Sequence, residues 1–231
     1  MVAGANPLRD RVRRLKRWEE LLQFVTQHSA PRWVYRGHAR HWVLRPSVGR
    51  GSHYNESREL QLFNEFKRVG GPLVDNSKLR SDWDWLFLAQ HHGLPTRLLD
   101  WTSNPLISIY FACQGSAAGE LIAVDVADVG TYTELEIANG PFGIDATKFV
   151  YPTVVAPRIA AQRGLFSVHS SPKKAWRLRD KTERLQILAE DKSDFLEFLF
   201  GFGVDAAMVM ADLDGISANL KWRYNSGRPL I

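Results

Sequence analysis

The chain has 231 residues, of which 45% are hydrophobic and 24% are charged, so it is long enough to bury one sizeable core and has an ordinary globular composition. A single cysteine, Cys113, excludes a disulfide bond within the chain, and a reducing compartment is expected. No apolar stretch approaches the length of a membrane span, and no apolar run follows the basic N-terminus as in a secretion signal. We therefore expect a cytoplasmic protein with no membrane partner.

Two basic clusters account for much of the formal net charge of +5. The first comprises Arg9, Arg11, Arg13, Arg14, Lys16 and Arg17, and the second comprises Arg158, Arg163, Lys173, Lys174, Arg177 and Arg179. Basic clusters attract the phosphates of nucleic acids and dinucleotides, so an anionic ligand or a nucleic acid is the expected partner. For the first cluster, the alternative is a solvated helix face.

Helical patterns dominate the first half of the chain. Residues 8–27 predict an amphipathic helix that ends before Pro31. Residues 32–37 alternate as a strand does, with Trp33 and Tyr35 on one face and Val34 and Arg36 on the other. Further helices are expected over residues 56–69, 82–92 and about 104–114, the last capped by Ser103 or Asn104 with Pro105 in its first turn.

Strand patterns become frequent after residue 120. Strands are expected over residues 121–124, 149–155, 165–169 and 208–210, helices over 193–202 and 212–222, and either a strand or a helix over 184–189. Strands and helices do not alternate regularly, which favours an α+β fold with a helix-rich N-terminal half and a strand-rich C-terminal half around one mixed sheet. Without repeats or linkers, residues 1–231 form one domain, in which residues 1–30 supply the N-terminal basic amphipathic helix.

The order of motifs along the chain supports a family resemblance. The motifs are Trp33-Val34-Tyr35-Arg36-Gly37, Trp42-Val43-Leu44-Arg45-Pro46-Ser47, the long segment from Gln90 to Pro105, and Ala161-Gln162-Arg163-Gly164-Leu165-Phe166. From about Arg32 to about Trp222 the chain closely resembles the FRG domain family, which is named for an aromatic-Arg-Gly motif. The resemblance implies a bacterial or phage setting such as phage defence or toxin activity.

Arg36 is the first candidate for binding. An arginine at the end of a strand presents a fork of N–H groups that can hold a phosphate or carboxylate through two hydrogen bonds. Gly37 lets the backbone turn sharply or approach a ligand closely. The alternative is that Arg36 forms a structural ion pair, for instance with Asp100.

His91 and His92 lie at the predicted end of a helix. Imidazole titrates near neutral pH, so either histidine is a candidate general acid or base. The alternative is a histidine bonded to the free carbonyl groups of the helix end.

Five further polar residues are candidates for the same site. Arg97 and Asp100 lie in an apolar segment and are expected to be paired or to line a pocket, because a lone buried charge is costly. Thr102 and Ser103 precede a helix, whose N-terminus attracts phosphate, although simple capping is equally compatible. Gln162 precedes a strand, where its amide suits a ribose or a base edge as well as a plain loop.

Other motifs are weak or missing from the sequence. Residues 201–206 fit the dinucleotide fingerprint in spacing but follow a helix, so we interpret them as a helix stop. No P-loop, nucleophile elbow or metalloprotease motif occurs, and the histidines and the lone cysteine lack the spacing of a zinc site. We expect no metal, and we expect Cys113 to be a buried hydrophobic residue.

The first functional hypothesis is an enzyme related to the ADP-ribosyltransferases, to which the chain is similar in plan. The similarity implies that Arg36 meets NAD, which is the substrate, and that Thr102 and Ser103 lead from a strand into a helix. A later position, here Gln162, completes the site. That position is usually a glutamate, and its replacement puts the catalytic activity in doubt.

Residues for the steps of this reaction are also present. The enzyme must hold the phosphates, stack the nicotinamide and stabilise positive charge on the ribose, which suits Arg36, Tyr35 or Trp101, and Asp100. The basic surface fits a nucleic-acid acceptor, and a protein acceptor fits nearly as well.

The alternatives are a non-catalytic module and a hydrolase. In the first, the basic clusters and the tryptophans Trp42, Trp83 and Trp101 bind nucleic acid or a nucleotide. In the second, His91 or His92 acts with Asp100. Both the transferase and the non-catalytic module lead us to expect that Arg36 and the Gln90–Thr102 segment line one pocket.

Overall fold

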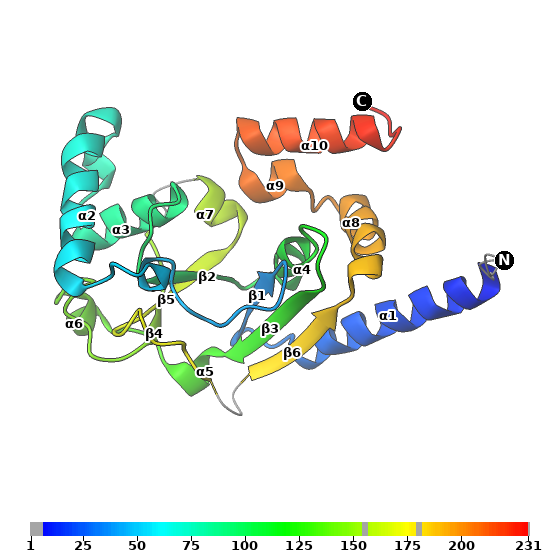
Figure 1. Ribbon diagram of the computed structural model, residues 1–231, viewed down its shortest axis with the longest axis horizontal. Coiled ribbons are helices and arrows are strands. Elements are labelled where there is room, and N and C mark those ends of the chain that lie inside the picture. The colour runs from blue at the N-terminus through cyan, green and yellow to red at the C-terminus, as the bar shows by residue number, and fades with distance from the viewer. Residues whose placement is uncertain (1–6, 154–156, 179–181, 231) are drawn as a thin grey trace.

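The computed structural model describes residues 7–153, 157–178 and 182–230. They form one six-stranded sheet and the helices around it (Figure 1). The strands are β1 (Trp33–His38), β2 (Leu98–Thr102), β3 (Gly119–Asp125), β4 (Lys148–Val150), β5 (Gly164–Val168) and β6 (Thr182–Ile187). Their order is β4-β5-β2-β1-β3-β6, and all neighbouring strands are antiparallel. The α+β class is confirmed. The expected mixed sheet is wrong, because the connecting segments return the chain so that neighbouring strands run in opposite directions.

Helices of very different lengths surround this sheet. They are α1 (Pro7–Gln27), α2 (Glu56–Gly70), α3 (Asp82–His91), α4 (Pro105–Ala112), α5 (Val126–Val129), α6 (Glu134–Ile137), α7 (Pro157–Ala161), α8 (Lys192–Gly201), α9 (Ala206–Met210) and α10 (Leu213–Asn225). In Figure 1, α2, α3 and α6 lie at one end of the molecule, and α1 and α8–α10 lie at the other. None of the described helices is long and apolar enough to span a membrane.

Local sequence explains where the helices next to the later site begin. Ser81 and Asp84 form a reciprocal capping box that starts α3. Asn104 caps α4 through a bond from the backbone N–H of Leu106, and Pro105 occupies the first turn. The cap of α4 is therefore Asn104, one of the two residues that the sequence offered.

Two apolar clusters share one face of the sheet. The first packs α1, α4 and α8 against β1, β3 and β6, with Tyr35 and Ile107 among its buried residues. The second packs α2 and α3 against β2, β4 and β5, with Leu98 and Phe166 among its buried residues. A third cluster covers the opposite face and includes Trp101. The boundary between the first two clusters runs along β1 and β2.

The pairing of β1 with β2 is much shorter than that of β1 with β3. β1 and β2 meet at one register position, Tyr35 with Thr102, whereas β1 and β3 pair at six positions. We call the contact between β1 and β2 the seam. α4 presses closely on β1 here, since a Cβ atom added at Gly37 would lie 1.8 Å from the carbonyl oxygen of Ser108. Gly37 is thus required by helix packing.

The second half of the chain differs from expectation in three places. Residues 206–210 form helix α9 instead of a strand over 208–210, because the Asp205 side chain caps the backbone N–H of Met208. Residues 182–187 are a strand, which resolves the ambiguity over 184–189. The strand expected over 149–155 is limited to β4, and residues 154–155 lie outside the described chain. The second half holds four of the six strands, but also α5–α10, so it is not simply strand-rich.

Candidate functional site

A cavity of about 310 Å³ opens at the seam between the two halves of the core. Its polar lining residues are Arg36 from β1, Gln90 and His91 from α3, Asp100 and Thr102 from β2, Ser108 from α4, and Arg158 and Gln162 from α7 and the loop after it. Apolar lining comes from Ile107, Phe111, Ile159, Leu165 and Phe166. The structure therefore places Arg36 and parts of the Gln90–Thr102 segment in one pocket, as the sequence led us to expect.

Arg36 connects the two strands of the seam through its side chain. Its Nη1 donates to the carbonyl oxygen of Asp100 at 2.5 Å and lies 3.7 Å from the Asp100 carboxylate, and its Nε donates to His38 at 2.9 Å. Burial lowers the pKa of the Arg36 guanidinium, and the charge of Asp100 opposes that shift. The ion pair with Asp100, proposed as the alternative to ligand binding, is present, but it is longer than a direct hydrogen bond.

Asp100 is held from a second direction by Gln90. The Gln90 side-chain amide donates to the Asp100 carboxylate at 2.8 Å, and its oxygen accepts a hydrogen bond from the hydroxyl of Thr96. The Thr96 oxygen in turn accepts from the backbone N–H of Leu98 at 3.1 Å. This chain of bonds fixes which end of the amide faces Asp100, and it connects the cavity to the start of β2.

Thr102 and Gln162 join β2 to the loop before β5. The Thr102 hydroxyl donates to the carbonyl oxygen of Gln162 at 2.6 Å, and the Gln162 side-chain amide donates to the carbonyl oxygen of Val209 at 3.0 Å. The next residue, Arg163, has a positive φ of 46°, which is unusual for a residue with a side chain. Gln162 therefore contacts the C-terminal helices as well as the cavity.

The two adjacent histidines have different positions. His91 lines the cavity, and burial together with the charges of His92 and Arg158 lowers its pKa, so the ring is neutral at neutral pH. His92 is exposed at the C-terminal cap of α3 and is not among the lining residues. Of the pair, His91 is therefore the one that lines the cavity.

Tyr35 and Trp101 border the cavity, but their rings are buried elsewhere. The exposed fractions of the two residues are 2% and 3%. The Tyr35 hydroxyl donates to the carbonyl oxygen of His28, and the Trp101 indole donates to the hydroxyl of Ser167 at 3.0 Å. Neither ring therefore exposes a face on which a ligand could stack, although both had been expected to do so.

Arg97 and Ser103 lie outside the cavity lining. Arg97 is 4% exposed and forms two hydrogen bonds with the carboxylate of Glu59, of 2.8 and 2.7 Å. It also donates to the carbonyl oxygen of Pro141 and lies over the ring of Phe142. Arg97 thus joins α2 to the segment that leads into β2. The Ser103 side chain is exposed to solvent.

Three polar residues of this region were not named individually as site residues, although Gln90 begins the segment that was expected to line the pocket. Gln90 precedes His91 on α3, Arg158 comes from the second basic cluster, and His38 follows Arg36 by two residues on β1. The strand alternation carried the information for His38, because residues two apart on a strand share a face. Gln90 and Arg158 had no comparable pattern, since their approach to the cavity depends on how α3 and α7 pack.

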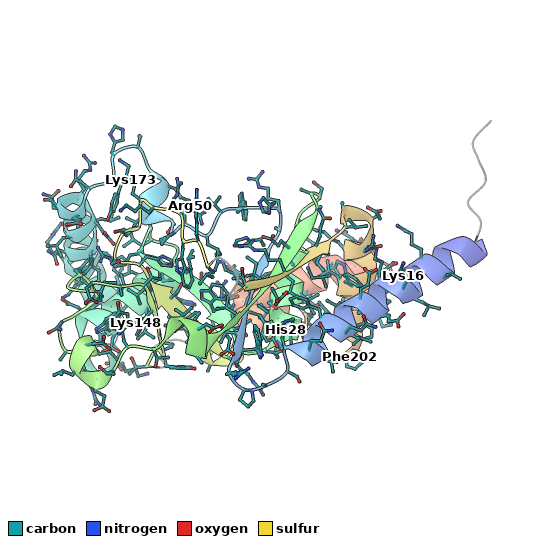
Figure 2. All side chains as sticks on the ribbon, turned by 90° about the horizontal axis from the view of Figure 1, so that it is seen from below. Lys16, His28, Arg50, Lys148, Lys173 and Phe202 are labelled. Carbon is teal, nitrogen blue, oxygen red and sulfur yellow. The ribbon has the colours of Figure 1, made fainter. Side chains whose placement is uncertain are left out.

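Among the described residues, the two basic clusters lie in different parts of the molecule, and several of their arginines are paired. Arg13, Arg14 and Arg17 form ion pairs with acidic residues at the start of α8 or on α1, namely Glu20, Glu190, Asp191 and Asp194. Figure 2 places Lys16 on α1 at one end of the molecule, and Lys173 and Arg50 together at the other end. Arg179 and the side chains of Arg9 and Arg11 lie outside the described part of the chain.

The tryptophans also differ from the expectation of an exposed set. Trp42 is 41% exposed and carries the guanidinium of Arg40 at 4.8 Å from its ring centre, whereas Trp83 and Trp101 are buried. Cys113 is buried, and burial raises its pKa to about 12, as expected for a hydrophobic cysteine. Across the described residues, no cluster of three or more His, Cys, Asp or Glu side chains could hold a metal ion.

The charges around the cavity suit a polar, anionic small molecule. Two arginines, Arg36 and Arg158, face one carboxylate, Asp100, so the lining carries a net positive charge. The neutral ring of His91 can accept a proton, and the amides of Gln90 and Gln162 add hydrogen-bonding groups at the wall. This combination can bind an anion and move a proton beside it.

Comparisons with known proteins bear on the first part of the chain. No curated protein and no solved structure matches the chain. A family model described as the FRG domain matches residues 31–120, which run from the start of β1 into β3 and include Arg36, Gln90 and Asp100. The predicted resemblance extended to Trp222, so the match covers its N-terminal part. Residues 31–120 thus match the FRG domain, which supports the family that the sequence motifs predicted.

Proposed function

We propose that the protein is an ADP-ribosyltransferase-like enzyme that takes NAD as its substrate and acts on a nucleic-acid or protein acceptor. The observation that most supports this proposal is that Arg36, Thr102 and Gln162 line one cavity, although they are far apart in the sequence. These are positions that the resemblance in plan assigned to the dinucleotide site. Ser103, assigned with them, is the exception, because its side chain is exposed outside the lining.

The cavity fits part of a dinucleotide. Its volume of about 310 Å³ is at the lower end of the range for small-molecule pockets, which is roughly 300–1,000 Å³. We infer that it takes the nicotinamide ribose, with the rest of the dinucleotide along the rim. Arg36 and Arg158 are the cations for the diphosphate, because a guanidinium fork matches phosphate oxygens in geometry and charge.

The side chains at the cavity also suit the chemistry. Cleavage of the bond between nicotinamide and ribose leaves positive charge on the sugar, which a nearby carboxylate stabilises. Asp100 is that carboxylate, since Gln90 and Arg36 hold it at the cavity wall and Gln162 stands where a glutamate is usual. His91 is neutral and accepts the proton that the acceptor group loses.

The non-catalytic nucleic-acid module has weaker support. Two of its three proposed stacking residues, Trp83 and Trp101, are buried, and Arg13, Arg14 and Arg17 are paired with carboxylates. Trp42 with Arg40 is the exposed pair that this alternative retains. The two proposals differ in their salt dependence, because nucleic-acid binding weakens steeply as salt rises, and binding in a pocket does so far less.

The test is a calorimetric titration of the protein with NAD, combined with an assay of nicotinamide release from the same samples. We expect saturable binding and release in the wild type, and loss of both in Arg36→Ala. Arg58→Ala is the matched control, because it removes an exposed arginine of α2 without touching the cavity. Asp100→Asn should keep most of the binding and lose the release. If millimolar NAD is neither bound nor cleaved, the enzyme proposal fails, and single-stranded nucleic acid across a salt series becomes the next ligand.

A further inference from the structure

His38 is a buried histidine that contacts the most important cation of the cavity without lining the cavity itself. It is 4% exposed, and it lies two residues after Arg36 on β1, on the same face of the strand. Its Nε2 atom is 2.9 Å from the Nε of Arg36. His38 therefore meets Arg36 from the side opposite to Asp100, at the other end of the guanidinium group.

The direction of this hydrogen bond determines where the ring proton of His38 lies. A guanidinium Nε–H is a donor only, so the Nε2 of His38 must be the acceptor. A neutral imidazole then carries its single proton on Nδ1, and that atom faces the Glu120 carboxylate at 3.8 Å. A protonated ring has N–H groups at both nitrogens and cannot accept from Arg36.

Glu120 is a fixed anion that favours this arrangement. Arg184 on β6 donates to its carboxylate at 2.8 Å, and the Nδ1 of His41 lies 3.3 Å from it. Burial alone would raise the pKa of Glu120, but the hydrogen bond from Arg184, the imidazole of His38 nearby and the positive charges of Arg184 and His41 lower it to about 2. The charged or titratable groups facing His38 are thus Arg36 on β1, Glu120 on β3, Arg184 on β6 and, beyond Glu120, His41.

We propose that His38, backed by Glu120, is a positioning residue that fixes the orientation of the Arg36 guanidinium in the seam. One edge of the guanidinium is tied to His38 and another to the carbonyl oxygen of Asp100. With these two contacts in place, the guanidinium cannot rotate, and its other N–H groups are presented to a phosphate or carboxylate in the cavity. The role in ligand binding rests on the proposed function, whereas the orientation of Arg36 can be tested without it.

The arrangement also predicts an acid-sensitive site. Burial is the main cause that lowers the pKa of His38 from 6.5, and the charges of Arg36 and Arg184 act in the same direction against the opposing effect of Glu120. The acceptor form therefore persists at neutral pH. Once the pH falls below the pKa of His38, the ring loses its acceptor and places a second positive charge beside Arg36, so the guanidinium is released from its orientation.

The first experiment observes the Nε–H resonance of Arg36 by nitrogen-15 NMR, assigned through its disappearance in Arg36→Lys. In the wild type we expect a signal at pH 7.5 whose chemical shift is displaced by the hydrogen bond to His38, and we expect this displaced signal to be lost on acidification as the shift moves to that of an unbonded guanidinium. His38→Gln should retain the signal at both pH values, because the glutamine oxygen replaces Nε2 as a pH-independent acceptor. His38→Leu should lose it at both, and His53→Leu, which changes an exposed histidine, should behave as the wild type. An unchanged signal in a folded His38→Leu protein would overturn the proposal.

The second experiment titrates the same proteins with inorganic pyrophosphate and with NAD. We expect His38→Leu to weaken binding roughly tenfold, as the loss of one orienting hydrogen bond implies, and His38→Gln to stay within about threefold of the wild type. Equal weakening in both variants would overturn the positioning role. If the NMR results hold while NAD is neither bound nor cleaved, the proposed function fails and the orientation of Arg36 by His38 stands.

Discussion

Arg36 lies on β1 and Arg97 lies directly before the neighbouring strand β2, but the two guanidinium groups have very different partners. Arg97 is 4% exposed, and Glu59 occupies its fork through two hydrogen bonds shorter than 3 Å. Arg36 has single contacts to three different groups, and its nearest carboxylate, on Asp100, is 3.7 Å away and 55% exposed. Arg97 is therefore satisfied within the protein, whereas Arg36 still has bonding capacity toward the cavity.

A structural arginine thus differs from one that has N–H groups left for a ligand. Both residues fall in the motifs that suggested the family, and from the sequence both were candidates for the site. What separates them is whether a carboxylate fills the guanidinium fork in the folded chain. Substitutions at these two arginines and at neighbouring residues test that separation.

The Arg97–Glu59 pair gives the largest expected loss of stability. Arg97→Met leaves the carboxylate of Glu59 buried and unpaired, so we expect the free energy of unfolding to fall by about 3–5 kcal/mol in urea denaturation. The double variant Glu59→Leu with Arg97→Met removes both charges and should recover much of the loss. A single variant with nearly wild-type stability would show that Arg97 is not the structural member of the two.

Gly37 tests whether the seam is rigid. A Cβ atom at this position would collide with the backbone of α4, so Gly37→Ala should destabilise the protein by about 1–3 kcal/mol and weaken NAD binding at the adjacent cavity. Gly51→Ala is the matched control, because nothing lies within 4 Å of its added Cβ atom. Urea denaturation and calorimetry measure the two effects, and equal stability of both variants would contradict the close packing of α4 on β1.

Replacing Arg36 should lower the free energy of unfolding by less than replacing Arg97. Arg36→Met leaves the acceptors at Asp100 and His38 without their partner, which corresponds to about 1–2 kcal/mol in urea denaturation. The same variant should lose the affinity for NAD, whereas the Arg97→Met protein should bind NAD wherever it remains folded. Equal losses of stability in the two variants would show that Arg36 and Arg97 do not differ in their structural importance.

Glu120 gives a prediction of a different kind, because its effect appears as a pH dependence of stability. Its pKa of about 2 in the folded protein lies below the ordinary 4.5. The stabilisation is therefore complete above pH 4.5 and is lost as the pH falls toward 2. In Glu120→Gln, the midpoint of urea denaturation should change less between pH 5 and pH 3 than it does in the wild type. The pKa of Glu136 is also about 2, but its side chain is 32% exposed against 11% for Glu120, so solvent screens its pair with Lys148 more and Glu136→Gln should change the profile less.

The sequence was sufficient for most of the elements and for the expectation that Arg36 and parts of the Gln90–Thr102 segment line one cavity. Helical periodicity predicted α1, α2, α3 and α8, and alternation predicted β1 and β5, because both patterns depend on local spacing. It was not sufficient for α9, where the apolar run of residues 208–210 reads as a strand until the cap by Asp205 is considered. The sequence also did not predict the relative direction of the strands, because local periodicity carries no information on whether neighbouring strands are parallel or antiparallel.

The motifs around Arg36 and from Gln90 to Thr102 were enough to identify the candidate residues of the site. The contacts that each candidate makes follow from the folded chain. It placed Glu59 against Arg97, and so removed that arginine from the cavity, and it brought His38, Gln90 and Arg158 to Arg36 and Asp100. The reason is physical: the state of a charged side chain depends on the partner that it meets in space, and these partners come from helices and strands far away in the chain.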